Sequence, residues 1–178
     1  RFAPHTFRED KACVAKACSN HGLSLEWAHP DLKNNPQVVR IAVENCGMAL
    51  AFASEKLRGD KEIVLAAVEE SGLSLEFADK KLRCDKDVVL AACGSNGRAL
   101  MAADAALKKD RDFIVEVMKV NREALDWVDK DIRWDREVIQ AACGRKGGSV
   151  SPSRRVRSPS PPDRARPITS KRVGGRSL

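Results

Sequence analysis

Basic side chains recur at one fixed spacing along this chain. Five of them stand 25 residues apart, at Lys33, Arg58, Arg83, Lys108 and Arg133. A row of Lys and Arg along one edge of a protein attracts phosphates or an acidic peptide. Cations close to the C-terminus of a helix also offset the helix dipole, and acidic residues such as Glu62 and Asp87 neutralise part of the strip. We therefore predict a partner-binding basic edge at the five positions, with a structural role for the same cations as the alternative.

A second candidate chemistry lies near the C-terminus, where Ser-Pro pairs stand among arginines. Its candidate phosphorylation sites are Ser151, Ser158 and Ser160. Residues 145–178 contain ten Lys and Arg against one Asp, whereas residues 1–144 contain 22 Lys and Arg against 24 acidic residues. Such a charged segment with few apolar residues is expected to be disordered, and each phosphate would add about −1.5 to −2 charges. The segment is interpreted as a phosphorylation-controlled arm for nucleic acid or an acidic partner, or else as a solvated terminus without a partner.

Motifs of catalysis and cofactor binding are missing from the sequence. It contains no Walker A loop, no dinucleotide-binding glycine fingerprint and no HExxH helix. Residues 94–97, GSNG, resemble a GxxG loop, but their position in the repeat marks a helix end. The three histidines, His5, His21 and His29, lack metal-site spacing, and no Cys-x-x-Cys pair or Cys/His quartet occurs. We predict a protein that is not an enzyme and that holds no metal or cofactor.

The cysteines favour a reducing compartment. Cys18, Cys93 and Cys143 share one position of the repeat with Val43 and Met118, which is typical of a small buried hydrophobe. The expected location is intracellular, in the cytoplasm or the nucleus. No run of eighteen apolar residues occurs, so no membrane-spanning segment is expected.

The whole pattern has a period of 25 residues. One column contains Asp or Asn, at Asp10, Asn35, Asp60, Asp85, Asp110 and Asp135. A second contains Leu, at Leu25, Leu50, Leu75, Leu100 and Leu125. A fixed period of this length indicates a repeat architecture in which each unit packs on its neighbours.

Each unit is predicted to be a helical hairpin. Asp60 is placed to cap a helix, and in the second unit Pro36 follows Asn35 at the favoured first helical position. Gly72 recurs as Gly22, Gly47, Gly97 and Gly147, which predicts a left-handed C-terminal cap, with a less regular turn at Arg122. A second helix is expected over 74–82, with the column of Trp27, Phe52, Phe77 and Trp127 packed in the core; a platform for stacking bases is the alternative.

Residues 60–93, DKEIVLAAVEESGLSLEFADKKLRCDKDVVLAAC, resemble the tandem repeats grouped as domain of unknown function 4116. The family pattern runs Asp-Lys-x-x-Val-x-x-Ala, then Gly-x-x-Leu, then Ala-x-x-x-Leu-Arg-x-Asp, and the similarity extends over residues 10–147. Arg122 and Ala102 depart from the pattern. The resemblance implies no catalytic residue or cofactor, and it implies a scaffold role by analogy alone.

The sequence thus predicts an all-α protein of tandem 25-residue helical hairpins, stacked as a short α-solenoid and followed by a disordered tail. Residues 1–9 are interpreted as the remnant of a truncated repeat, because Phe2 and Phe7 fall in the columns of Trp27 and Leu32, and the chain as a fragment. The array occupies 10–148, as five full units and a half unit, and the tail occupies 149–178.

The function hypothesis is a non-enzymatic scaffold for protein–protein interaction, whose partner is a protein and not a membrane. One alternative is a nucleic-acid-associated protein whose tail contacts phosphates. The other is an accessory repeat region of a larger enzyme.

Overall fold

The computed structural model describes residues 5–144, and over these residues the chain is all α-helical and made of stacked tandem repeats. Each repeat begins with one long helix. These helices are α2 (Lys11–Asn20), α4 (Pro36–Asn45), α6 (Lys61–Glu70), α8 (Lys86–Ser95), α10 (Arg111–Val120) and α12 (Arg136–Cys143). The predicted caps are present: the Asp60 carboxylate accepts a hydrogen bond from the N–H of Glu62, and Asn35 accepts from Gln37 and Val38.

The predicted second helix over 74–82 is wrong as one continuous helix. It consists of a 3₁₀ helix and a short α-helix, separated by two residues, Ala78 and Asp79. The 3₁₀ helices are η1 (Gly22–Trp27), η2 (Gly47–Phe52), η3 (Gly72–Phe77), η4 (Gly97–Ala102) and η5 (Arg122–Trp127). The short helices are α1 (His5–Glu9), α3 (Pro30–Lys33), α5 (Glu55–Arg58), α7 (Lys80–Arg83), α9 (Ala105–Lys109) and α11 (Lys130–Arg133).

The break has a local cause. Ala78 adopts φ −70° and ψ 154°, which ends η3, and the next residue, Asp79, caps α7 by accepting a hydrogen bond from the N–H of Lys81. Ser54 and Asp104 cap α5 and α9 in the same way. A side chain that satisfies the free N–H groups of a new helix favours starting one at that point over continuing the previous helix.

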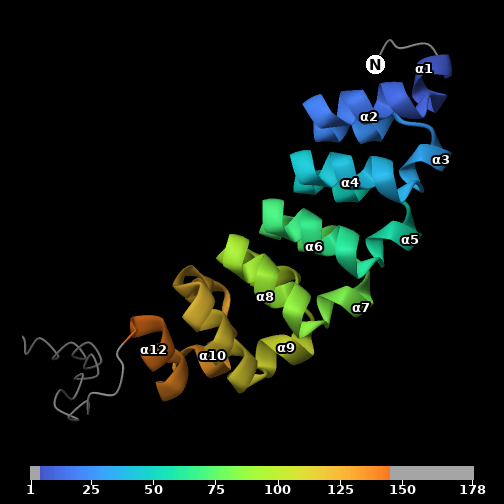
Figure 1. The fold of residues 1–178 in the computed structure, drawn as a ribbon. Helices are drawn as coiled ribbons and strands as arrows, with labels where there is room; N and C mark the ends of the chain where they lie inside the picture. Colours follow the sequence, from blue (N-terminus) through green and yellow to red (C-terminus); the bar gives the residue numbers. More distant parts are fainter. Residues whose placement is uncertain (1–4, 145–178) are drawn as a thin grey trace, which may run out of the picture. The chain divides into compact units, whose positions relative to one another are not determined.

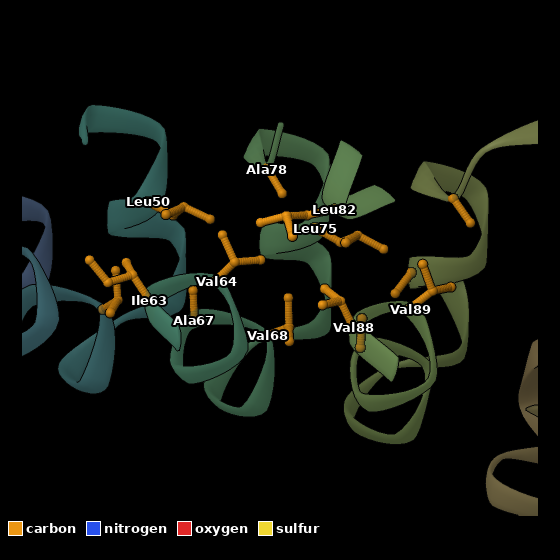
Figure 2. Close-up of a cluster of buried hydrophobic side chains, with 14 of the residues drawn as sticks. Leu50, Ile63, Val64, Ala67, Val68, Leu75, Ala78, Leu82, Val88 and Val89 are labelled. Atoms are coloured by element: carbon orange, nitrogen blue, oxygen red, sulfur yellow. The ribbon is translucent and has the colours of Figure 1, made fainter. Parts of the chain in front are cut away.

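The long helices α2, α4, α6 and α8 lie side by side, and the short helices α3, α5, α7 and α9 lie along one edge (Figure 1). The core runs through all the repeats. Figure 2 shows Val64 of α6 beside Leu75 of η3, and both side chains are fully buried. Leu50 of the preceding repeat and Val89 of the following one are buried in the same cluster. Because long helices of ten residues are marginal alone in water, this shared core is what stabilises them.

The predicted left-handed glycine caps are also wrong at Gly22, Gly47, Gly72 and Gly97, while Gly147 lies outside the described residues. Among the described residues, Gly144 has a positive φ, of 65°, whereas the recurring glycines such as Gly47 and Gly72 do not. They are required for a different reason. A Cβ atom at Gly72 would overlap the carbonyl oxygen of Ala92 in the next repeat, and a Cβ at Gly47 would overlap that of Ala67. The glycine therefore permits close approach between repeats.

The fifth repeat packs differently from the others. It carries Val117 and Arg122 where other repeats have Ala and Gly. Gly97 of the fourth repeat consequently faces the main chain at Ala124. A Cβ atom added at Gly97 would lie 2.6 Å from the N atom of Ala124. The predicted less regular turn at Arg122 is wrong, because the turn residue Asn121 keeps the same extended conformation as Ser71. What differs in this repeat is its contact with the repeat before it.

Main-chain hydrogen bonds join successive short helices. The N–H of Asp79 donates to the carbonyl oxygen of Arg58 at 2.9 Å, and that of Ser54 donates to the oxygen of Lys33 at 3.0 Å. The N–H of Asp104 repeats this contact with Arg83 at 3.1 Å. The edge that carries the predicted basic residues is therefore held at a regular spacing by the backbone.

Candidate interaction surface

The five residues of the predicted basic edge lie on the short helices, each half-buried. The cationic groups of three of them, Lys33, Lys108 and Arg133, contact the 3₁₀ helix of the same repeat or the residue that follows it. Lys33 Nζ donates to the carbonyl oxygen of Glu26 at 2.8 Å, and Lys108 Nζ donates to that of Met101 at 2.9 Å. Arg133 Nη2 donates to the carbonyl oxygens of Asp126 and Val128, at 2.6 and 2.9 Å. These contacts satisfy carbonyl groups at the C-terminal end of a 3₁₀ helix, where a cation is favourable.

The basic edge therefore has a structural role in its own repeats, whatever else it binds. Arg58 Nη2 lies 3.9 Å from Glu55 Oε1 on the same short helix. Arg83 and Arg133 each have a buried Nε atom without a hydrogen-bond partner. Partner binding by the edge stays a prediction.

A second set of charges links neighbouring repeats. We call it the ion-pair ladder: Lys61 with Asp85 and Asp87, Lys86 with Asp110, and Arg111 with Asp135 and Glu137. In each pairing, the basic residue that follows one helix cap reaches the capping carboxylate of the next repeat. The distances are short, with Lys61 Nζ 2.8 Å from Asp85 Oδ2 and Lys86 Nζ 2.7 Å from Asp110 Oδ2.

The ladder also changes the acidity of its carboxylates. The hydrogen bond from Lys61 lowers the pKa of Asp85, and the hydrogen bond from Lys86 lowers the pKa of Asp110. The same contacts raise the pKa of both lysines. These caps therefore remain ionised into the acid range.

The aromatic column is divided between core and surface. Phe52 and Phe77 pack against the buried core, as predicted. Trp27 and Trp127 are 39 % and 40 % exposed, so their rings also contribute to the surface. The guanidinium of Arg98 lies 5.6 Å from the centre of the Trp127 ring, within range of a cation–π interaction.

Hollows occur on the surface where two repeats meet. The groove between α4 and α6 has a volume of about 440 Å³, and its walls are the apolar side chains of Pro36, Leu65 and Ala66 with the carboxylates of Glu62 and Glu69. A second hollow of about 440 Å³ lies beside Met101, Lys108 and Trp127, between the fourth and fifth repeats. Both are open surfaces lined by apolar and charged side chains.

The cysteines differ in burial according to their repeats. Cys18 and Cys93 are fully buried, and burial raises the pKa of Cys93 to about 12. Cys143 is exposed, because no later described repeat covers α12. All six described thiols are free.

The described residues contain neither a candidate metal site nor a candidate membrane-spanning helix. No group of three or more His, Cys, Asp or Glu side chains there could hold a metal ion. Within the same residues, no helix combines the length and apolar character needed to cross a bilayer. Ser151, Ser158 and Ser160, and the rest of the predicted disordered tail over 149–178, lie outside the described residues.

The ladder and the second set of caps are not among the features predicted from the sequence. A basic residue follows the caps Asp60, Asp85 and Asp110, and the available signal was the spacing of 24 residues between it and the next capping carboxylate. The second caps also recur every 25 residues, and most are Ser or Asp, which favour helix starts. They are His29, Ser54, Asp79, Asp104 and Asp129.

No curated protein and no solved structure matches the chain. A family model described as a domain of unknown function, DUF4116, matches four overlapping stretches, residues 10–58, 35–83, 60–108 and 85–133. Each match begins at a helix cap, and its neighbour begins one repeat later, so the family model spans about two repeats. Together the matches cover most of the stack, and the chain belongs to the DUF4116 family.

Proposed function

We propose that this chain is a non-enzymatic scaffold that binds other proteins along its stacked repeats. The repeats combine a constant interior with a variable surface. Leu50, Leu75 and Leu100 are fully buried in successive repeats. The residues that directly follow them are Ala51, Glu76 and Met101. Repeat proteins use such a frame to present different side chains at regular intervals.

The groove between α4 and α6 is the observation that carries this proposal. Its apolar wall, at Leu65 and Ala66, is half-buried on the outer side of the long helices. It lies between charged side chains, Glu62 at one end of α6 and Glu69 at the other. An apolar strip with a charged rim resembles the composition of a protein-binding surface.

The finer architecture is part of the proposal. We take the stack to be an α-solenoid whose long helices form a continuous binding surface. An intracellular location is included, because the exposed thiols of Cys84 and Cys143 suit a reducing compartment.

Photo-crosslinking tests the scaffold function. A benzoyl-phenylalanine placed at Ala66, in the groove, should form a covalent adduct with a partner protein in cells that express the full chain. The same group at Ala106, exposed on α9, serves as the control for random collision. Scanning the remaining exposed positions of α4, α6 and α8 extends the test. Absence of any protein adduct above the control across this scan would refute the proposal.

A second candidate is nucleic-acid association through the basic tail, supported by ten Lys and Arg residues against one Asp in residues 145–178. Binding of single-stranded RNA and duplex DNA should then weaken steeply with salt, because each phosphate contact releases counterions. Binding by residues 1–178 but not by 1–148 supports the tail. Equal, salt-sensitive binding by both would instead place the contact on the repeats and count against the protein scaffold.

A further inference from the structure

The ion-pair ladder does not extend to the first two junctions. Between the first and second repeats the cap is Asn35, and Lys11 Nζ donates to Gln37 Oε1 at 2.6 Å. Between the second and third repeats, the position that supplies Lys61 and Lys86 elsewhere is occupied by Pro36. Asp60 and Glu62 consequently form no ion pair with any described residue. They are the counterparts of Asp85 and Asp87, which together bind the ammonium group of Lys61 at 2.8 and 3.2 Å.

One oxygen of Asp60 is available for a cation. Its Oδ1 accepts the N–H of Glu62 at 3.0 Å, as Oδ1 of Asp85 accepts the N–H of Asp87 at 3.0 Å. In Asp85 the other oxygen, Oδ2, takes the lysine. The junction between the third and fourth repeats thus shows that a pair of carboxylates at these two positions binds a lysine ammonium group.

The groove between α4 and α6 opens at this same junction. Three carboxylates, those of Asp60, Glu62 and Glu69, lie along it. Arg40 also lines it. Its Nε atom is hydrogen-bonded to Glu44 Oε1 at 2.8 Å on the same helix, and its charge also acts on Glu62, so three carboxylates face one guanidinium. The charge of the groove is therefore negative, and it disfavours the phosphates of a nucleic acid.

We infer that the groove binds a peptide segment of a partner protein in which a Lys or Arg stands beside aliphatic side chains. The cation takes the place of the missing ladder contact, between Asp60 and Glu62. The methylene stem and the neighbouring aliphatic groups cover Pro36, Leu65 and Ala66. This inference rests on the proposed scaffold function and specifies the chemistry of one partner.

The test begins with a random peptide library displayed on phage and selected on the full chain. Selected peptides are synthesised with a fluorescent label, and their Kd is measured by anisotropy. They should contain a Lys or Arg next to Leu, Ile, Val or Met. P36K introduces the ammonium that the other repeats supply, so it should weaken binding about tenfold or more by occupying the carboxylates.

Two matched variants separate charge from shape. P36A removes the proline ring without adding a cation, so it loses only part of the apolar wall and should weaken binding clearly less than P36K does. D60N keeps the helix cap, as Asn35 does in the preceding repeat, and should weaken binding about fivefold through loss of charge. Circular dichroism of each variant checks that the repeats remain folded.

Equal affinity for wild type, P36K and D60N would overturn the inference, and so would a selection that yields acidic peptides or no binding peptide. Peptides that bind equally to all variants would leave the scaffold function intact, since they would bind elsewhere on the chain. Failure of the crosslinking scan, in contrast, would refute the scaffold itself.

Discussion

The Nζ atom of Lys86 lies 2.7 Å from Oδ2 of Asp110, 24 residues further along the chain. The contact joins the start of one long helix to the cap of the next. Oδ1 of the same carboxylate accepts the N–H of Phe113 at 3.2 Å, so one side chain both caps its own helix and binds the neighbouring repeat. Local helix stability and contact between repeats thus depend on the same group.

Acid should weaken this contact. The hydrogen bond from Lys86 lowers the pKa of Asp110 below its ordinary 3.8, so the stabilisation is complete above that value and is lost as the pH falls through the lower folded-state pKa. K86Q should therefore be less stable than wild type at pH 7, and the difference should vanish at about pH 2. Urea unfolding followed by circular dichroism measures both. K56Q is the control, since Lys56 forms no ion pair with a described residue. A K86Q difference that persists unchanged in acid would contradict the mechanism.

Gly72 should tolerate no larger side chain. In G72A the new methyl group overlaps the carbonyl oxygen of Ala92, which forces the two repeats apart; the expected loss is about 1–3 kcal/mol or more. In G59A the nearest atoms lie at 3.5 Å, an ordinary contact, and the φ of −96° suits alanine, so stability should hold or rise by about 0.4–1 kcal/mol. Thermal and urea unfolding compare the two variants. Equal stability of G72A and G59A would show that close approach is not the reason for the glycine.

The stability lost when a core leucine is replaced by alanine should depend on the position of that leucine in the stack. L75A removes a fully buried side chain between two repeats and should cost about 2–5 kcal/mol. Leu125 occupies the same column but is only partly buried, so L125A should cost clearly less. Denaturant unfolding gives both values, and a larger loss for L125A would mean that the final repeats have the tighter core.

Thiol labelling should distinguish the cysteines by burial. Cys84 and Cys143 are exposed and should react within minutes with a maleimide or an aromatic disulfide. Cys18 and Cys93 are fully buried, and burial raises the pKa of both. Their labelling should require unfolding, which peptide mass spectrometry after timed reaction detects. Fast labelling of Cys93 in the native protein would show that the fourth repeat opens readily.

Much of the fold was predictable because its signals are local or strictly periodic. The cap at Asp60 and the apolar stripe that follows it are sufficient to place α6. The break before α7 was also available in the sequence, since Asp79 is a capping residue in a column with Ser54 and Asp104. The apolar spacing over 74–82 predicts one helix, whereas the column of capping residues marks a break within it.

The role of the glycines could not be predicted from their own repeat. A left-handed cap and a close approach of two main chains both require glycine, and Gly72 has the same local sequence in either case. The deciding atom, the carbonyl oxygen of Ala92, belongs to the next repeat. The groove between α4 and α6 could not be predicted for the same reason. Pro36 leaves Asp60 without a lysine partner, and Asp60 belongs to the next repeat.

The backbone hydrogen bonds between short helices have a consequence for how such proteins diversify. The bond from the N–H of Asp79 to the carbonyl oxygen of Arg58 involves no side-chain atom. Substitution of side chains therefore leaves the spacing of that edge unchanged. A lineage can exchange the outward-facing groups there while the distance from one unit to the next stays constant. New recognition properties can then arise by point mutation, one unit at a time, without a redesign of the frame.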